Sequence, residues 1–195
     1  MAEFNFPTEV IDLPSKGLIY PKDNPLSSGK VEIKYMTAKE EDILSNQAYI
    51  QNGTVLDKLL DSVVMSKINL KDLVIGDKNA VLIATRILGY GSDYSFTING
   101  NQQTIDLSTL ENKPFDGSLM IDGKNEFAFT LPHSKTDITY KLLDGHDEVK
   151  IERELKGLKK INKNASPEAT TRLKYTITSV NGETETKAVR EFVDN

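Results

Sequence analysis

The sequence predicts an α+β fold: an extended N-terminal arm, a three-helix core, a small antiparallel β-meander and C-terminal helices. Apolar residues recur at helical spacing over 37–90 and again over 144–195, whereas the segment between them alternates apolar and polar residues around hairpin turns. A chain of 195 residues is long enough to bury a core. We therefore divide it into an arm (1–29), a strand and helical core (30–92), an antiparallel β region (93–143), and a C-terminal helical region (144–195) that either stands alone or packs with 30–92 as one domain.

The arm is predicted to run extended because it holds four of the seven prolines, which fix φ and cannot donate to a sheet. It also carries more apolar side chains than a solvated tail keeps. We expect residues 4–29 to dock on a partner subunit through Leu13, Pro14, Leu18, Ile19, Tyr20 and Pro21. Two alternatives stay open: the arm wraps its own domain, or it is a disordered leader.

A half-buried strand is predicted at 30–35, where apolar and charged residues alternate. Thr37 and Glu40 have the spacing of a capping box, which predicts a helix running to about Ile50. A second, strongly apolar helix is expected to start after Thr54, and a third runs from about Asp77 to the glycines at 89 and 91.

The β region begins with a predicted hairpin of 94–98 and 103–107, joined by Asn99-Gly100, a sequence typical of a tight hairpin turn. Further strands are expected at 119–121, 126–131 and 138–143, with Asp122-Gly123 as a turn. Together these strands would form one small sheet or meander.

The C-terminal region is predicted to hold a helix capped by Asp144, a second that starts at Ser166-Pro167 and runs through Val180, and a last one from about Thr184. The order of strand, cap and acidic first turn at 30–41 recurs at 138–148. It is either a duplicated unit or the usual pattern of a strand-to-helix junction. The sequence leaves open whether the natural chain extends beyond Asn195.

Composition narrows the function classes. Cysteine is absent, which removes disulfides, thiolate catalysis and Cys-based zinc sites. The formal net charge of −5 disfavours non-specific nucleic-acid binding, which depends on neutralising phosphates. No apolar run is long enough for a bilayer, and the first residues lack the segments of a signal peptide, so we expect a cytoplasmic product without a membrane partner.

No catalytic pattern stands out. His133 and His146 are isolated from each other, and neither a nucleophile elbow nor a phosphate-binding loop is present. The candidate acids all lie in helix first turns, where the helix dipole accounts for them: Glu40, Glu41, Asp42, Asp147 and Glu148. We predict no enzyme activity, metal, cofactor or small-molecule substrate; the alternative is a hydrolase that uses a carboxylate pair. The basic stretch over 150–163 is either a solvated face or a docking face for an acidic partner.

Three blocks of sequence resemble the baseplate hub assembly proteins of T-even-type contractile-tailed phages. They are Leu13-Pro14-Ser15-Lys16-Gly17 with Tyr20-Pro21, then Met36 to Leu44, then Arg86 to Tyr94, which together cover roughly residues 10–95. Some members of that family carry a Cys pair next, where this chain has Asn99-Gly100 in a segment without cysteine.

The resemblance implies a hub assembly chaperone or minor structural hub component whose partners are other phage baseplate or hub proteins, with no catalytic site and no cofactor. It implies the host cytoplasm during assembly and leaves open whether the protein stays in the virion tail baseplate. The alternatives from other classes are a tail-tip cell-wall hydrolase and a nucleic-acid-binding tail-completion factor, the latter disfavoured by the net charge.

Overall fold

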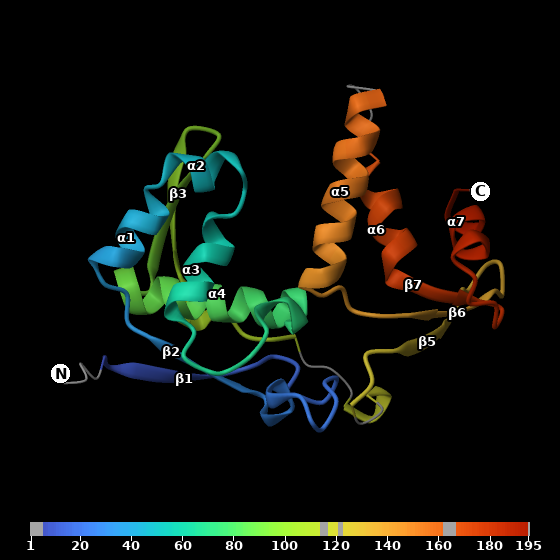
Figure 1. The fold of residues 1–195 in the computed structure, drawn as a ribbon, viewed down its shortest axis with the longest axis horizontal. Helices are drawn as coiled ribbons and strands as arrows, with labels where there is room; N and C mark the ends of the chain where they lie inside the picture. The colour runs from blue at the N-terminus through green and yellow to red at the C-terminus, as the bar shows by residue number, and fades with distance from the viewer. Residues whose placement is uncertain (1–5, 114–116, 121–122, 162–166, 195) are drawn as a thin grey trace. The chain divides into compact units, whose positions relative to one another are not determined.

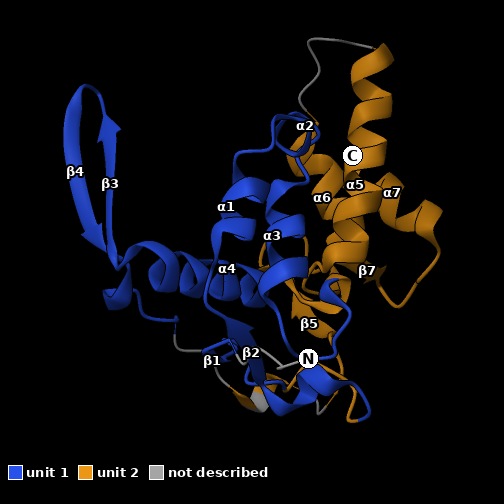
Figure 2. Cartoon of the chain, turned by 60° about the vertical axis from the view of Figure 1, so that its left-hand side comes forward, with its two compact units in different colours: residues 1–17, 23–70, 76–115 blue, residues 18–22, 71–75, 116–195 orange. Residues whose placement is uncertain are grey.

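The computed structural model describes residues 6–113, 117–120, 123–161 and 167–194, and these residues have the predicted α+β fold (Figure 1). The chain forms two compact units that are not consecutive in sequence (Figure 2). Unit 1 is made of residues 1–17, 23–70 and 76–115, and unit 2 of residues 18–22, 71–75 and 116–195.

Unit 1 begins with a two-stranded antiparallel ribbon of β1 (Thr8–Asp12) and β2 (Lys30–Lys34), in register from Thr8↔Lys34 to Asp12↔Lys30. Val31 and Ile33 are fully buried while Glu32 between them is exposed, as the predicted alternation requires, but Lys34 is buried and Tyr35 is exposed, so the alternation does not continue to residue 35. The helices of unit 1 lie over one side of this ribbon (Figures 1 and 2).

The segment between β1 and β2 folds back on its own chain. The backbone N–H of Leu13 donates to the carbonyl of Gly29 at 2.8 Å, and a short 3₁₀ helix, η1 (Pro25–Ser28), leads into β2. Gly17 has φ +78°, and a Cβ there would lie 2.4 Å from the carbonyl oxygen of Ser27. Only glycine therefore fits at this crossing of two backbones.

The predicted helix from Thr37 to Ile50 is instead two helices, α1 (Ala38–Leu44) and α2 (Gln47–Gln51). The break occurs because the Asn46 side chain accepts hydrogen bonds from the N–H groups of Ala48 and Tyr49 and starts a new helix. With α3 (Val55–Val63) and α4 (Ile75–Tyr90), the segment holds four α-helices rather than the predicted three.

The predicted hairpin is confirmed as β3 (Asp93–Ile98) and β4 (Asn101–Asp106). Positive φ angles at Asn99 and Gly100 form the primed turn that matches strand twist. The single meander predicted over 93–143 is wrong, because this ribbon is a sheet of its own. The 3₁₀ helix η3 (Leu107–Thr109) follows it.

Unit 2 contains the second sheet, ordered β5-β6-β7 and antiparallel throughout: β5 (Phe127–Thr130), β6 (Asp137–Tyr140) and β7 (Ile177–Val180). Three helices lie on one side of it (Figure 1): α5 (Gly145–Ile161), α6 (Glu168–Thr176) and α7 (Thr186–Asp194). The core of the unit includes Ile151 and Val189.

Two further expectations for unit 2 are wrong. The helix predicted to run through Val180 ends at Thr176, because residues 177–180 pair with β6 as β7. A short 3₁₀ helix, η4 (Gly117–Leu119), reaches into the strand predicted at 119–121. Another 3₁₀ helix, η2 (Leu70–Asp72), overlaps the start of the 71–75 segment. Residues 121, 122 and 166, which those predictions also used, lie outside the described residues. None of the described helices combines the length and apolar character needed to cross a membrane.

Candidate docking surface

The residues of the arm that the sequence predicted to contact a partner are largely enclosed by their own chain. Leu13, Ile19 and Tyr20 are at most 5% exposed, Pro14 and Leu18 are half-buried, and Pro21 is exposed. The Tyr20 hydroxyl accepts a hydrogen bond from the backbone N–H of Val74 at 3.1 Å. In this conformation the arm wraps its own chain, and partner binding by these six residues stays a prediction.

Glu40, the first of the candidate acids, is fully buried and held on both carboxylate oxygens. One oxygen accepts from Lys34 Nζ at 2.8 Å and from the Ser62 hydroxyl; the other accepts from the backbone N–H and the hydroxyl of Thr37. Burial alone would raise the pKa of Glu40, but the hydrogen bonds from Lys34, Ser62 and Thr37 outweigh it and lower the pKa to about 2. Glu40 is therefore a structural group that is ionised at neutral pH.

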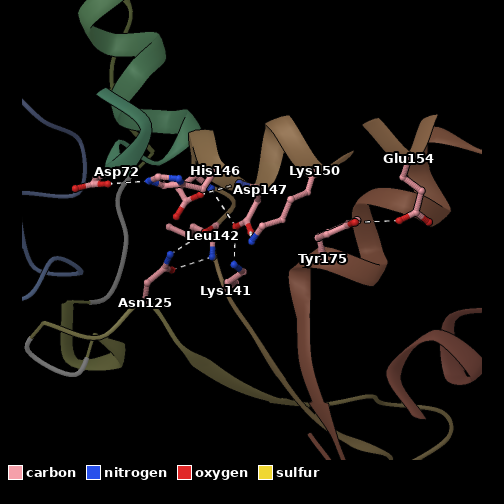
Figure 3. Close-up of polar contacts among 10 residues, drawn as sticks. Asp72, Asn125, Lys141, Leu142, His146, Asp147, Lys150, Glu154 and Tyr175 are labelled. Atoms are coloured by element: carbon pink, nitrogen blue, oxygen red, sulfur yellow. Dashed lines mark hydrogen bonds and ion pairs between the residues drawn. The ribbon is translucent and has the colours of Figure 1, made fainter. Parts of the chain in front are cut away.

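Asp147 lies in the first turn of α5, which follows β6, just as Glu40 lies in the first turn of α1, which follows β2. Asp147 is 2% exposed, and Figure 3 shows Lys141 and Lys150 directed toward its carboxylate. Its backbone N–H donates to the Asp144 side chain at 2.9 Å, so the predicted cap is present. Beside it, His146 contacts Asp72 at 3.0 Å.

The two junctions share more than the sequence analysis recognised. Lys34 precedes Glu40 by the same spacing by which Lys141 precedes Asp147, and both lysines pair with a buried first-turn acid. The caps and acids were visible in the sequence, but the lysines were missed because each lies at or directly after the end of a strand and its acid lies on the following helix, so no single periodicity relates the two.

Other candidate acids also have partners. The Glu148 carboxylate accepts hydrogen bonds from both terminal nitrogens of Arg172, and the Glu41 carboxylate accepts one from the Tyr90 hydroxyl. Glu154 was not singled out in the sequence. Its carboxylate accepts hydrogen bonds from both terminal nitrogens of Arg190 and from the Tyr175 hydroxyl (2.9 Å; Figure 3).

The Arg190 contact lowers the pKa of Glu154, against the raising effect of its partial burial, while burial and the same carboxylate raise the pKa of Tyr175.

Among the described residues, no group of three or more His, Asp or Glu side chains is arranged to hold a metal ion. His133 lies exposed in the turn between β5 and β6.

An exposed apolar surface lies on the β3–β4 ribbon. Its register places Tyr94 opposite Ile105, Phe96 opposite Gln103 and Ile98 opposite Asn101, so these side chains share one face. On that face Tyr94 is 44% exposed, Ile98 55% and Ile105 40%, and the rings of Tyr94 and Phe96 stack with centroids 5.9 Å apart. We call these four apolar side chains, Tyr94, Phe96, Ile98 and Ile105, the apolar face.

The opposite face of the ribbon carries Asp93 and Asp106 at its base and uncharged polar side chains beyond them. The hydroxyls of Ser95 and Thr104 lie 2.8 Å apart, and Thr97 is opposite Gln102. From Tyr94 to Ile105 the chain contains no charged residue, although 27% of the whole chain is charged. This gap in the charge pattern is the signal by which the sequence marked the ribbon, and the sequence analysis passed over it.

The base of the ribbon is fixed to the end of α4 by Arg86. Its guanidinium donates to the carbonyls of Gly91 (2.9 Å) and Asp93 (3.3 Å) and lies over the rings of Tyr90 and Tyr94. The ribbon is therefore held at its base against the end of α4 and projects away from the helices of unit 1, as Figure 2 shows.

Comparisons of the chain with models of known protein families, with curated proteins and with solved structures find no match.

Proposed function

We propose that this chain is a phage tail baseplate hub assembly protein that acts through protein–protein contacts, as a chaperone or as a minor structural hub component. The observation that carries the proposal is the exposed apolar face of the β3–β4 ribbon. A two-stranded ribbon is marginally stable by itself, and an apolar face on it gains stability when another surface covers it. The three sequence blocks within residues 10–95 that resemble baseplate hub assembly proteins support a hub protein as the partner that covers this face.

Binding accounts for the charged groups better than catalysis does. A hydrolase needs one carboxyl that is free to donate a proton and a second that is poised to attack or to activate water. Glu40 and Asp147 are instead buried against lysines, and Glu148 is held by both terminal nitrogens of Arg172. These partners give the acids structural roles, and no observation favours the hydrolase.

The test is a pull-down of tail proteins from phage-infected lysate with the tagged full chain. The test variant is I98T/I105T, which keeps β-branched side chains in the strands but removes most of the apolar character. Losing about 1 kcal/mol per Ile side chain at an interface, about 2 kcal/mol for the two, is expected to weaken binding of hub proteins roughly 30-fold and to lower their recovery accordingly. The matched control, T97S/T104S, changes the opposite face and is expected to recover as much as the wild type.

Both variants are first compared with the wild type by circular dichroism and urea unfolding, so that a folding defect is recognised. Recovery of no tail protein by the wild type would refute the proposed function, whereas equal recovery by I98T/I105T would show that the partner binds elsewhere. Probing finished virions for the chain then distinguishes a hub component, which is present, from a chaperone, which is absent. Unchanged turbidity of a cell-wall suspension is the outcome expected if the chain is no hydrolase.

A further inference from the structure

We infer that the outer edge of β4 pairs with the same edge in a second copy of this chain, so that two ribbons form one continuous antiparallel sheet. The inference concerns the backbone edge of the ribbon, whereas the proposed function concerns its apolar face. Each can therefore fail without the other.

The hydrogen-bond pattern of the ribbon shows which backbone groups face outward. The N–H of Leu107 donates to the carbonyl of Ser92 at 2.9 Å, which fixes the phase of the ladder. In an antiparallel pair, hydrogen-bonded and non-hydrogen-bonded positions alternate. Phe96↔Gln103 is thus a hydrogen-bonded pair, while Gln102 and Thr104 direct their N–H and C=O groups out of the ribbon along the β4 edge.

No described strand pairs with this edge, because the sheet consists of β3 and β4. It also lacks the usual guards against pairing, which are lysines, prolines and bulges. The other ribbon of unit 1 shows what guarding looks like in this chain, since its strands carry charged residues throughout: Glu9, Asp12, Lys30, Glu32 and Lys34. The β4 edge has none between Asn101 and Ile105.

The position of the two-fold axis follows from which outward backbone groups of β4 already have hydrogen-bond partners in their own chain. The Asp106 carbonyl accepts a hydrogen bond from the Thr109 hydroxyl at 2.7 Å, which leaves the outward groups of Gln102 and Thr104 for pairing. These two residues are symmetric about Gln103. Self-pairing therefore places Gln103 opposite Gln103 of the second copy, and Gln102 opposite Thr104 of the second copy.

The absence of charge favours a second copy over a different strand. In a two-fold pair every residue near the axis meets itself or a close neighbour, so any charge there would face a like charge. A glutamine side chain both donates and accepts hydrogen bonds and is compatible with its own copy. Because opposite residues share a face, the apolar faces of both copies join on one side of the sheet, and added strands stabilise an otherwise marginal ribbon.

The experiment measures the mass of the full chain by sedimentation equilibrium from about 1 to 200 µM, a range that brackets a micromolar dissociation constant. Wild type is expected to form dimers. Q103K and Q103E, each placing two like charges across the axis, are expected to raise the dissociation constant at least tenfold, and an equimolar mixture of the two is expected to restore dimers. A wild type that stays monomeric at 200 µM, or a mixture no tighter than either variant alone, would overturn the inference.

A pair of proline variants tests the edge itself. T104P removes an outward N–H of β4, and T97P removes the equivalent outward N–H of β3, while both leave the internal ladder of the ribbon intact. T104P is expected to be monomeric and T97P dimeric, with similar urea unfolding midpoints. Dimers that survive T104P, or that are lost equally in T97P, would contradict pairing through β4.

Discussion

Replacing Glu40 by Gln removes the negative partner of a buried lysine. Lys34 is 8% exposed, its Nζ lies 2.8 Å from Glu40 Oε1, and the Phe6 ring covers it at 5.0 Å. Breaking a buried ion pair by removing one partner costs about 3–5 kcal/mol, because the remaining charge stays buried. With a urea m-value of about 2 kcal/mol/M for a chain of this size, a loss of 3 kcal/mol lowers the unfolding midpoint by about 1.5 M.

The pH dependence gives a second, independent magnitude. The ordinary pKa of Glu40 is 4.5 and the folded protein lowers it to about 2, so the folded state favours the ionised form. That preference is worth about 3 kcal/mol at pH 7, is present in full above pH 4.5 and is lost as the pH falls toward 2. At pH 3 only about 1 kcal/mol of it is left, so the gap between wild type and E40Q is expected to narrow.

The assay is urea unfolding of both proteins at pH 7 and pH 3, followed by circular dichroism. E41Q is the matched control, because Glu41 is an exposed neighbour on the same helix turn and its loss is expected to cost less than about 1 kcal/mol. Removing both charges with K34M/E40L is expected to recover much of the loss, since no buried charge is left unpaired. An E40Q midpoint within 0.3 M of wild type (~0.6 kcal/mol), with the same pH dependence, would refute this account of the pair.

Two further changes test the packing of each unit. G17A is expected to lower the free energy of unfolding by about 2 kcal/mol or more, because Cβ would meet the Ser27 carbonyl; G53A shares the positive φ but has open space and is expected to lose only about 1 kcal/mol. R190Q is expected to cost about 1 kcal/mol at pH 7, and less below the ordinary pKa of Glu154, since the contact that lowers that pKa is lost. Urea unfolding measures the free energy of unfolding of all these variants, with R153Q as the control for a helix-surface arginine. A loss in G17A no larger than that in G53A, or equal losses in R190Q and R153Q, would contradict the reasoning.

The sequence predicted elements whose signals are local. The β3–β4 turn is specified by Asn99-Gly100, and the start of α1 by Thr37 and Glu40. Ile177 to Val180 were mistaken for helix because a short apolar run fits both periodicities, and the strand that decides the matter, β6, lies far away in sequence. Asn46 offered a readable cap signal that was overlooked.

The candidate site was predictable in part. The charge-free run from Tyr94 to Ile105 is visible in the sequence, but its exposure depends on what packs against the ribbon, which only the fold determines. The reverse holds for Leu13, Ile19 and Tyr20: their apolar character was evident, yet the same character suits a partner interface and the protein's own core equally well.

The interleaving of the units affects how the protein is made. Residues 18–22 belong to unit 2, whose remaining segments lie at 71–75 and from 116 onward, so a ribosome releases them long before their neighbours exist. Unit 1 has all of its segments once residue 115 has emerged, whereas unit 2 waits for the last helix, and contacts that far apart in sequence form slowly. For the same reason, deleting residues 1–29 would remove β1 together with a segment of unit 2, so truncation would report on folding before it reported on any partner.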